Sequence, residues 1–430
     1  MCVAEEIQGT LIGASAEQGS AAETPVRVGV VGVGSRGFTH VRTLLDVPGV
    51  EIPAICDVNE SLVKRSQDLV EQAGRRRPVG YAGGVEDFRR LVERDDLDAV
   101  IATGPWEWHT PVCVAAMQAG KYAATEVPAA LTVDECWELV DTSEQTGKPC
   151  MLLENVCYYR NVMLVLNLIR QGMLGELFHA AGGYQHDVRG AKIGPTGEVK
   201  WRGQHAVARN ANLYPTHPIG PIAWWADINR GDRFTYLVSM SSRSRGINRY
   251  VAERFGADHP NATRQYALGD VNTTLIQTAR GFTVTLYHDT QSPRPYDLIL
   301  QVQGTEGIYS GTLDKIYLEG RSPRQGTRHQ TPVWEDMADY YRQYEHPVWQ
   351  SLGQTARQYP HGPADYLELH QFVQAVRRQV QTPIDVYDAA TWSVITPLTE
   401  RSVASKSAAI DFPDFTRGKW ATTKPIEILA

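Results

Sequence analysis

A valine-rich run followed by a glycine-rich turn, residues 26–37, constrains this chain more than any other stretch. The run is apolar on both faces because of Val26, Val28, Val30, Val31 and Val33. Apolar character on both faces is typical of a strand buried in a parallel sheet. Gly32, Gly34 and Gly37 follow with G-x-G-x-x-G spacing, and apolar residues at helical spacing come next. Such a turn leaves the backbone open to a pyrophosphate at a helix N-terminus, so the stretch predicts a dinucleotide site.

An acidic residue after the next predicted strand defines the nucleotide further. Residues 50–56 form that strand, and Asp57 follows it, twenty positions after Gly37. A carboxylate there suits the two hydroxyls of an adenosine ribose. Residues 58–60 contain no basic side chain that would hold a 2′-phosphate. We therefore predict NAD(H) rather than NADP(H), the alternative being a structural glycine turn followed by a surface aspartate.

The composition indicates a globular protein and excludes several functions. The chain has 430 residues and a net charge of −7, without a long basic run, so neither nucleic acid nor an anionic membrane is expected as a partner. No apolar run approaches the roughly 20 residues of a membrane span. The six cysteines show no paired spacing, which indicates reduced thiols, and no metal site is predicted. Residues 1–24 lack signal-peptide features, so we expect a flexible tail and a cytoplasmic protein.

The pattern of elements predicts an α/β fold with two domains. Strand–helix units over residues 25–150 predict an NAD-binding domain with a doubly wound parallel sheet. Residues 151–430 alternate strands and predict a substrate-binding α+β domain with a large open, mostly antiparallel sheet. Its strands are expected at 178–184, 235–240, 273–277, 282–288 and 297–303. The other expectations are long functional loops over 185–234, a packing helix at 363–380 and a surface tail at 411–430.

Ligands of parallel sheets sit beyond the carboxyl ends of the strands. Residues that follow three predicted strands are therefore expected near the nicotinamide: Trp106, Glu107, Trp108, His109, Glu126, Val127, Glu154 and Asn155. Many two-domain proteins of this kind use the lysine of a Glu-Lys-Pro triplet to move a proton, but Val127 takes that place here. Because valine cannot carry a proton, the acid–base group must lie elsewhere.

The second half of the chain offers two candidates for that group. Pro215 and Pro218 flank His217, and a fixed backbone suits a histidine that points into a cleft; a loop histidine bonded to backbone is the alternative. His186 and Asp187 are adjacent, a pattern more typical of a hydrogen-bonded pair that is structural or that supports a neighbouring functional residue. Several tryptophans could form either a sugar-stacking wall or part of the core: Trp106, Trp108, Trp201, Trp224 and Trp225. Core packing is favoured for Trp224 and Trp225.

Taken together, the motifs resemble the Gfo/Idh/MocA oxidoreductase superfamily and, within it, glycoside hydrolase family 109, the NAD-dependent α-N-acetylgalactosaminidases. The matching stretches are Gly32–Gly37, Cys56–Asp57, Trp106–His109, Glu126–Ala130, Glu154–Tyr158, Gly183–Arg189, Trp201–Arg202, Tyr214–His217, Ile228–Asp232, Pro293–Tyr296 and Asp411–Trp420. Those at Trp106–His109, Glu154–Tyr158 and Tyr214–His217 are specific to the family. Val188, Tyr159 and the short loop at 190–200 depart from its pattern.

The resemblance implies a retaining glycosidase acting on α-N-acetylgalactosaminides through transient C3 oxidation, C1–C2 elimination, water addition and re-reduction. It implies His217 as the base for the 3-hydroxyl and Tyr184 as the base at C2, assisted by Glu154 and Tyr214. The implied substrate contacts are Tyr184, Arg202, Tyr214, Pro215, Thr216, His217 and Tyr296. The implied cofactor contacts are Gly32, Gly34, Ser35, Arg36, Gly37, Asp57, Trp106, Glu107, Trp108, His109, Glu126, Val127 and Asn155.

Two other functions stay open on the sequence. A net NAD-dependent sugar dehydrogenase or epimerase would oxidise C3 of a hexose or hexosamine and release a keto-sugar, and Val127 argues against it. A catalytically idle NAD-binding protein is disfavoured because His217, Tyr184 and Glu154 are all present. The expected partner is a small-molecule glycoside, and a homo-oligomer is an expectation from the resemblance.

Overall fold

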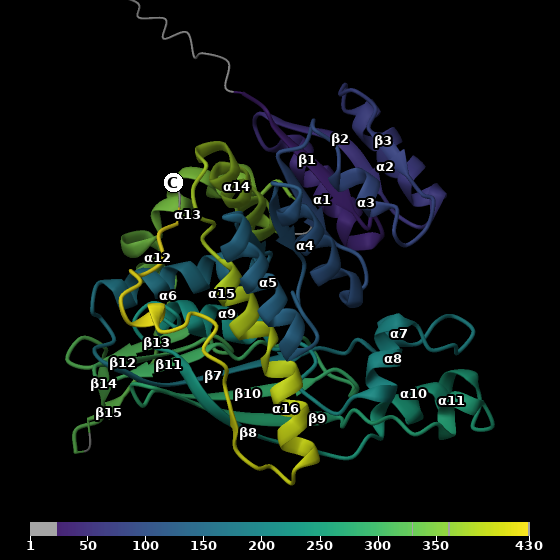
Figure 1. Ribbon diagram of the computed structural model, residues 1–430. Helices are drawn as coiled ribbons and strands as arrows, with labels where there is room; N and C mark the ends of the chain where they lie inside the picture. Colours follow the sequence, from purple (N-terminus) through teal and green to yellow (C-terminus); the bar gives the residue numbers. More distant parts are fainter. Residues whose placement is uncertain (1–23, 329, 360–361, 429–430) are drawn as a thin grey trace, which may run out of the picture.

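The computed structural model describes residues 24–328, 330–359 and 362–428. Residues 1–23 of the predicted tail lie outside this range. Two sheets organise the chain (Figure 1): a six-stranded sheet near the start of the chain and a nine-stranded sheet in the remainder. The predicted fold class, a parallel Rossmann-type sheet with a second sheet-based domain, is confirmed.

The first sheet is parallel throughout, in the order β3-β2-β1-β4-β5-β6. Its strands are β1 (Val26–Val31), β2 (Val50–Cys56), β3 (Val79–Tyr81), β4 (Ala99–Ala102), β5 (Tyr122–Thr125) and β6 (Cys150–Leu152). The helices between them are α1 (Ser35–Asp46), α2 (Glu60–Gln72), α3 (Phe88–Val92), the 3-10 helix Trp106–Trp108, α4 (His109–Gln118) and α5 (Val133–Thr146). Central strand β1 is buried on both faces, as its valines predict.

The second sheet is mixed, in the order β16-β13-β12-β11-β7-β10-β9-β8-β17, and only the β7–β10 pair is parallel among its registered pairs. Its strands are β7 (Leu177–Gln185), β8 (Phe234–Ser241), β9 (Val271–Thr278), β10 (Thr283–Asp289), β11 (Gln301–Gly304), β12 (Gly307–Ser310), β13 (Lys315–Leu318), β16 (Glu335–Asp336) and β17 (Ile410–Asp411). A separate hairpin pairs β14 (Arg324–Gln325) with β15 (Thr331–Pro332).

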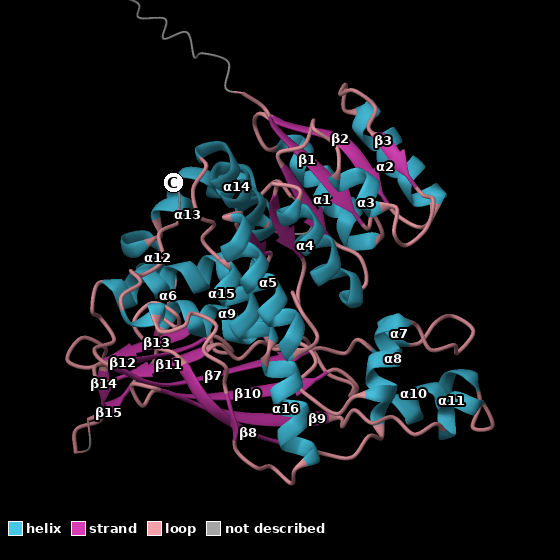
Figure 2. Cartoon of the chain, viewed as in Figure 1, coloured by secondary structure: helices cyan, strands magenta, loops and turns pink. Residues whose placement is uncertain are grey.

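Helices cover one face of this sheet and separate it from the first sheet (Figure 2). Besides α7, α8, α9 and α14, which are described below, the α-helices of this half are α6 (Arg160–Arg170), α10 (Gly246–Phe255), α11 (Pro260–Thr263), α12 (Ala338–Tyr344), α13 (Pro347–Ala356), α15 (Val386–Ser393) and α16 (Ile395–Ala404). The core expectation for Trp224 and Trp225 is confirmed, since they are 2% and 1% exposed. On the other face of the sheet, Met240 and Leu275 are exposed.

Helix α14 (Pro363–Arg378) connects the two halves of the molecule. It packs against α1 of the first domain and against the 3-10 helix Asn155–Tyr158 that follows β6. Figure 1 shows α14 beside the first sheet, although it comes from the last quarter of the chain. Side chains of α14 therefore reach the carboxyl ends of the parallel strands.

Two sequence expectations in the second domain were wrong. Residues 185–234 are not open loops, because they contain α7 (Arg189–Lys192), α8 (Trp201–Ala208) and α9 (Thr216–Trp225). Pro218, Gly220 and Pro221 disfavour a helix locally, so the sequence does not predict α9, which is stabilised as a buried helix by tertiary packing. The strand expected at 297–303 begins only at Gln301, because Ile299 and Leu300 have φ of 62° and 45°.

The tail expected on the surface is also partly built into the fold. Strand β17 pairs with β8, and Phe412 and Phe415 just beyond it are buried. Apolar side chains there gain more by burial than a surface course would allow. The exposed part begins after these two aromatics, where most residues from 417 to 428 are exposed.

Candidate active site

The glycine-rich turn has the shape a pyrophosphate requires. Gly32 has φ of 87°, and a Cβ on Gly37 would lie 1.9 Å from the Gly32 carbonyl oxygen, so neither position tolerates a larger residue. A Cβ on Gly34 would meet no atom within 4 Å, so the turn faces open space. No side chain caps the N-terminus of α1. The Asp57 carboxylate is fixed at the end of β2, where it accepts the Val33 N–H at 2.8 Å.

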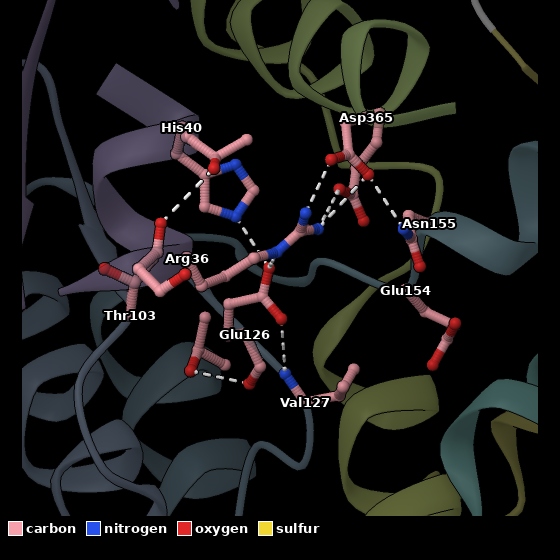
Figure 3. Close-up of polar contacts among 12 residues, drawn as sticks. Arg36, His40, Thr103, Glu126, Val127, Glu154, Asn155 and Asp365 are labelled. Atoms are coloured by element: carbon pink, nitrogen blue, oxygen red, sulfur yellow. Dashed lines mark hydrogen bonds and ion pairs between the residues drawn. The ribbon is translucent and has the colours of Figure 1, made fainter. Parts of the chain in front are cut away.

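Next to this turn, Arg36 on α1 enters a network of acidic residues (Figure 3). Its Nε donates to Glu126 Oε1 at 2.5 Å, and His40 Nε2 lies 2.6 Å from the same oxygen. Burial alone would raise the pKa of Glu126, but the Arg36 charge and the His40 hydrogen bond hold it well below its usual range. Glu126 is therefore an ionised carboxylate at the carboxyl end of β5.

The same arginine joins the two halves of the molecule. Arg36 Nη1 donates to Asp365 Oδ2 on α14 at 2.5 Å, and Asn155 Nδ2 donates to Asp365 Oδ1 at 2.8 Å. Figure 3 shows Asp365 between the arginine and the asparagine. Asp365 was missed in the sequence, where its helix was predicted only to pack. Arg36 and Asn155, predicted as cofactor contacts, thus share one carboxylate.

The strongest contact on the substrate side joins His217 to Glu154. His217 Nδ1 lies 2.7 Å from Glu154 Oε1, which also accepts the Val156 N–H at 3.2 Å. Glu154 is fully buried, whereas the His217 side chain keeps 15% of its surface exposed. The contact uses Nδ1 and leaves Nε2 of the ring for another partner. The sequence placed Glu154 near the nicotinamide, and the structure adds that it holds the ring of His217.

Two tyrosines stand beside this dyad. The rings of Tyr184 and Tyr214 are 4.4 Å apart, and the His217 ring lies 5.3 Å from Tyr184 and 4.8 Å from Tyr214. Burial raises the pKa of Tyr184 to about 12 and that of Tyr214 further. Both phenols are therefore neutral near pH 7, and Arg202 offsets part of the effect on each.

His186 and Asp187 are both hydrogen-bonded in supporting roles, but each has a different partner rather than the other. His186 Nδ1 lies 3.0 Å from the Tyr184 hydroxyl, while Asp187 accepts from Arg189 at 2.8 and 2.9 Å. Consecutive residues of extended chain point to opposite sides, which separates the two side chains. Burial lowers the pKa of His186, so its ring is a neutral acceptor for the Tyr184 proton. His186 thus supports the site through the Tyr184 hydroxyl, which is one of the two roles the sequence left open.

Aromatic rings and one cation form the outer wall. The Arg202 guanidinium lies 5.5 Å from the Trp106 ring centre and 5.7 Å from that of Tyr214. The Trp106 ring is 5.9 Å from Tyr214, which connects the predicted cofactor side to the predicted sugar side. Tyr296 closes the other side, 4.9 Å from the His186 ring.

Other predicted site residues serve the framework. His109 is buried, with ring nitrogens 2.7 Å from the Pro128 oxygen and 2.9 Å from the Gly104 oxygen. The backbone N–H of Val127 faces Glu126 Oε2 at 3.4 Å. Glu107 points toward His205 at 3.8 Å. The rest lie at the ends of helices. Ser35 is the first residue of α1, and Trp108 is the last of the 3-10 helix Trp106–Trp108. Pro215 precedes α9, and Thr216 is its first residue.

The part of the chain that the structure describes contains no group of three or more His, Cys, Asp or Glu side chains suited to a metal ion. Within those same residues, no helix combines the length and the apolar character needed to cross a membrane. The five described cysteines are all buried and free.

Comparison with known proteins decides the family. Residues 158–422 match the model of the glycosyl hydrolase 109 C-terminal domain, and residues 26–153 match the NAD-binding Rossmann fold of the oxidoreductase family. An α-N-acetylgalactosaminidase of Tannerella forsythia is 42% identical over 93% of this chain and 88% of its own length. This chain belongs to glycosyl hydrolase family 109. Another family 109 protein, from Shewanella pealeana, is 44% identical over 94% of this chain and 88% of its own.

Solved structures support the fold of this family 109 chain. A levoglucosan dehydrogenase in complex with NADH and L-sorbose superposes with a TM-score of 0.66 at 18% identity, covering 91% of this chain and all of the other. A myo-inositol dehydrogenase from Lactobacillus casei, in complex with NAD(H) and myo-inositol, gives 0.62 at 16% identity, with 91% and 99% coverage. The predicted resemblance is confirmed: the chain is a glycoside hydrolase with an NAD-binding Rossmann domain.

Proposed function

We propose that this family 109 hydrolase removes α-linked N-acetylgalactosamine by transient oxidation at C3 of the sugar, with overall retention at C1. The observation that carries the proposal is the His217–Glu154 dyad, held 2.7 Å apart beside Tyr184. The relative from Tannerella forsythia, named as an α-N-acetylgalactosaminidase, supports the choice of sugar.

The residues of the first domain fit NAD as the cofactor. The open side of Gly34 admits the pyrophosphate, the N-terminus of α1 binds it, and Asp57 accepts the ribose hydroxyls. When bound, NAD⁺ supplies the acceptor for the hydride of C3 and returns that hydride in the last step. The ionised Glu126 and Asp365 hold Arg36 at the edge of this site.

His217 is the base for the 3-hydroxyl. With Nδ1–H donating to Glu154, the Nε2 lone pair is free to take the hydroxyl proton as C3 becomes a ketone. The buried carboxylate stabilises the positive ring that results. The proton stays on His217 until C3 is reduced, when it returns to the 3-oxygen.

Tyr184 and His186 together remove the proton at C2, which the C3 ketone has made acidic. A neutral phenol is a weak base, so the Tyr184 oxygen takes the C2 proton while its own proton moves to His186 Nδ1, 3.0 Å away. The C2 electron pair forms the C1–C2 double bond, and the C1–O pair leaves with the leaving group, which takes a proton from water. The hydroxide left by that water then adds at C1, and the same pair returns a proton to C2.

The test follows p-nitrophenyl α-N-acetylgalactosaminide with catalytic NAD⁺ in D₂O. The proposal expects many nitrophenols per enzyme, deuterium at C2 of the released sugar and no net NADH. Stoichiometric NADH without nitrophenol would instead establish a net sugar dehydrogenase. Release without deuterium at C2 would refute the elimination.

Two variants separate the steps. Tyr184→Phe should still build up NADH absorbance, because His217 remains, but should release no nitrophenol and exchange no C2 proton. His217→Ala should do neither while still binding NAD⁺. The matched control is Tyr236→Phe on the open face of the second sheet, which should behave as wild type. Full hydrolysis by either site variant would contradict its assigned role.

A further inference from the structure

A second glutamate lies buried between the nucleotide side and the His217–Glu154 dyad. Glu368 on α14 has no exposed surface, and neither of its carboxyl oxygens has a hydrogen-bond partner among the described residues. The nearest cation, Arg36, is 3.9 Å away and already binds Asp365 and Glu126 at 2.5 Å. The ion pairs around Glu368 therefore do little to stabilise its ionised form.

The surroundings of Glu368 contain more acid than base. The titratable groups around it come from α14, α1, the ends of β5 and β6, the following 3-10 helix and α15: Asp365, Arg36, His40, Glu126, Glu154, Cys157, Tyr158 and Asp388. Burial first, and then the charge of Glu126, raise the pKa of Glu368 well above its usual range. Both effects favour the protonated form of Glu368, which has an O–H to donate.

Two neighbours have unpaired polar atoms as well. Glu154 uses Oε1 for His217, while its Oε2 is buried without a partner among the described residues, and so is the Tyr158 hydroxyl. Buried polar groups are nearly always hydrogen-bonded, through ordered water where no side chain reaches. Glu368 interacts electrostatically with both Glu154 and Tyr158, so a single bound water between them would satisfy all three side chains.

We propose that Glu368 is a positioning residue that donates its O–H, through a water bound near Tyr158, to Glu154 Oε2. This proposal rests on the proposed function, since it concerns the base of that reaction. The donated hydrogen bond shares the negative charge of Glu154. Without it, the full charge acts on His217, which holds its proton more tightly and becomes available as a base only at higher pH.

The direction of this effect distinguishes the proposal from its alternative. Glu368→Leu removes the donor and should move the acid limb of the kcat/KM profile up by about one pH unit, a roughly tenfold loss one unit below the wild-type midpoint. Glu368→Gln keeps an N–H donor and should leave the limb in place. If Glu368 were instead an ionised carboxylate, both variants would remove a negative charge and move the limb down, which would overturn the proposal.

Val373→Ala is the control for packing. Val373 is fully buried on the same helix, and five residues place it roughly 140° around the axis from Glu368. Its variant should lower the melting temperature without moving the acid limb. A shift of the limb in Val373→Ala equal to that in Glu368→Leu would mean that packing, and not the hydrogen bond, controls the dyad.

Two measurements do not depend on hydrolysis. In the free protein, NMR titration of the His217 ring should show protonation at higher pH in Glu368→Leu than in wild type and Glu368→Gln. The infrared difference spectrum between wild type and Glu368→Gln should contain the carbonyl band of a protonated carboxylic acid. Absence of that band would refute the neutral acid even if hydrolysis were confirmed, while its presence with no hydrolysis would refute only the proposed function.

Discussion

Replacing Glu154 with glutamine tests the dyad directly, because it removes one charge and almost no volume. The Oε1 atom of a glutamine still accepts from His217 Nδ1, so the ring keeps its orientation and its tautomer. Only the charge that stabilises a protonated ring is lost. The variant therefore measures electrostatics rather than geometry.

The structure sets the size of the effect. The contact is 2.7 Å and the carboxylate is fully buried, so solvent does not screen it. A hydrogen bond to a charged group is worth about 1.5–3 kcal/mol, which corresponds to about 1–2 pH units in the protonation of the ring. The acid limb of kcat/KM should move down by that amount. If about half of the loss in basicity of His217 is expressed in the transition state, the plateau value of kcat/KM above the acid limb should fall roughly three- to tenfold.

The assay is the pH dependence of nitrophenol release, with NMR titration of the His217 ring alongside. Glu144→Gln, the same change at a surface carboxylate of α5 paired with Lys419, is the matched control and should leave both unchanged. An acid limb that stays in place, or moves up, in Glu154→Gln would show that Glu154 does not control His217. A collapse in melting temperature would instead assign Glu154 a structural role.

Three further predictions concern the framework. Burial lowers the pKa of Lys192 to about 7, so between pH 7 and 10 the unfolded chain binds a proton that the folded chain lacks; stability should rise by about 4 kcal/mol over that range relative to Lys192→Met, as measured by urea denaturation at each pH. A difference in unfolding free energy between the two proteins that does not change with pH would contradict this prediction. Gly37→Ala should lower the melting temperature and abolish the thermal shift on adding NAD⁺, because its Cβ would lie 1.9 Å from the Gly32 oxygen. Arg230→Met should cost about 3–5 kcal/mol of unfolding free energy, since it strands the buried Asp385 and Asp388, whereas the exposed Arg249→Met should cost almost nothing.

The nucleotide turn could be predicted from sequence because its information is local. The valines of β1, the three glycines and Asp57 lie within about thirty positions, and each is required by backbone geometry or by one known ligand. The motifs that indicated the family resemblance are also short and local, and the family models confirm that resemblance.

The sequence predicted Glu126 and Glu154, but the two acidic residues that α14 adds to the site could not be predicted. Helix α14 was expected from its apolar residues to serve for packing, and amphipathic periodicity does not distinguish buried acidic residues from exposed ones. Asp365 and Glu368 are instead 1% and 0% exposed. Their partner Arg36 is 329 positions away from Asp365, beyond any local signal. The supporting role of His186 was among those expected, but its partner could not be predicted, because consecutive residues of extended backbone point to opposite sides and His186 contacts Tyr184 rather than Asp187.

The contact between Arg36 and Asp365 also has a consequence for how the protein is made. Ribosomes add about 5–20 residues per second, so roughly 15–65 s pass between synthesis of the arginine and of its aspartate, 329 positions later. For most of that time, Glu126 is the only one of the two carboxylates bound by Arg36 that has been synthesised. The nucleotide site of the nascent chain is thus finished by one of the last helices to leave the ribosome, and a chain released before residue 363 would carry the glycine turn without the contact that fixes Arg36 to the second domain.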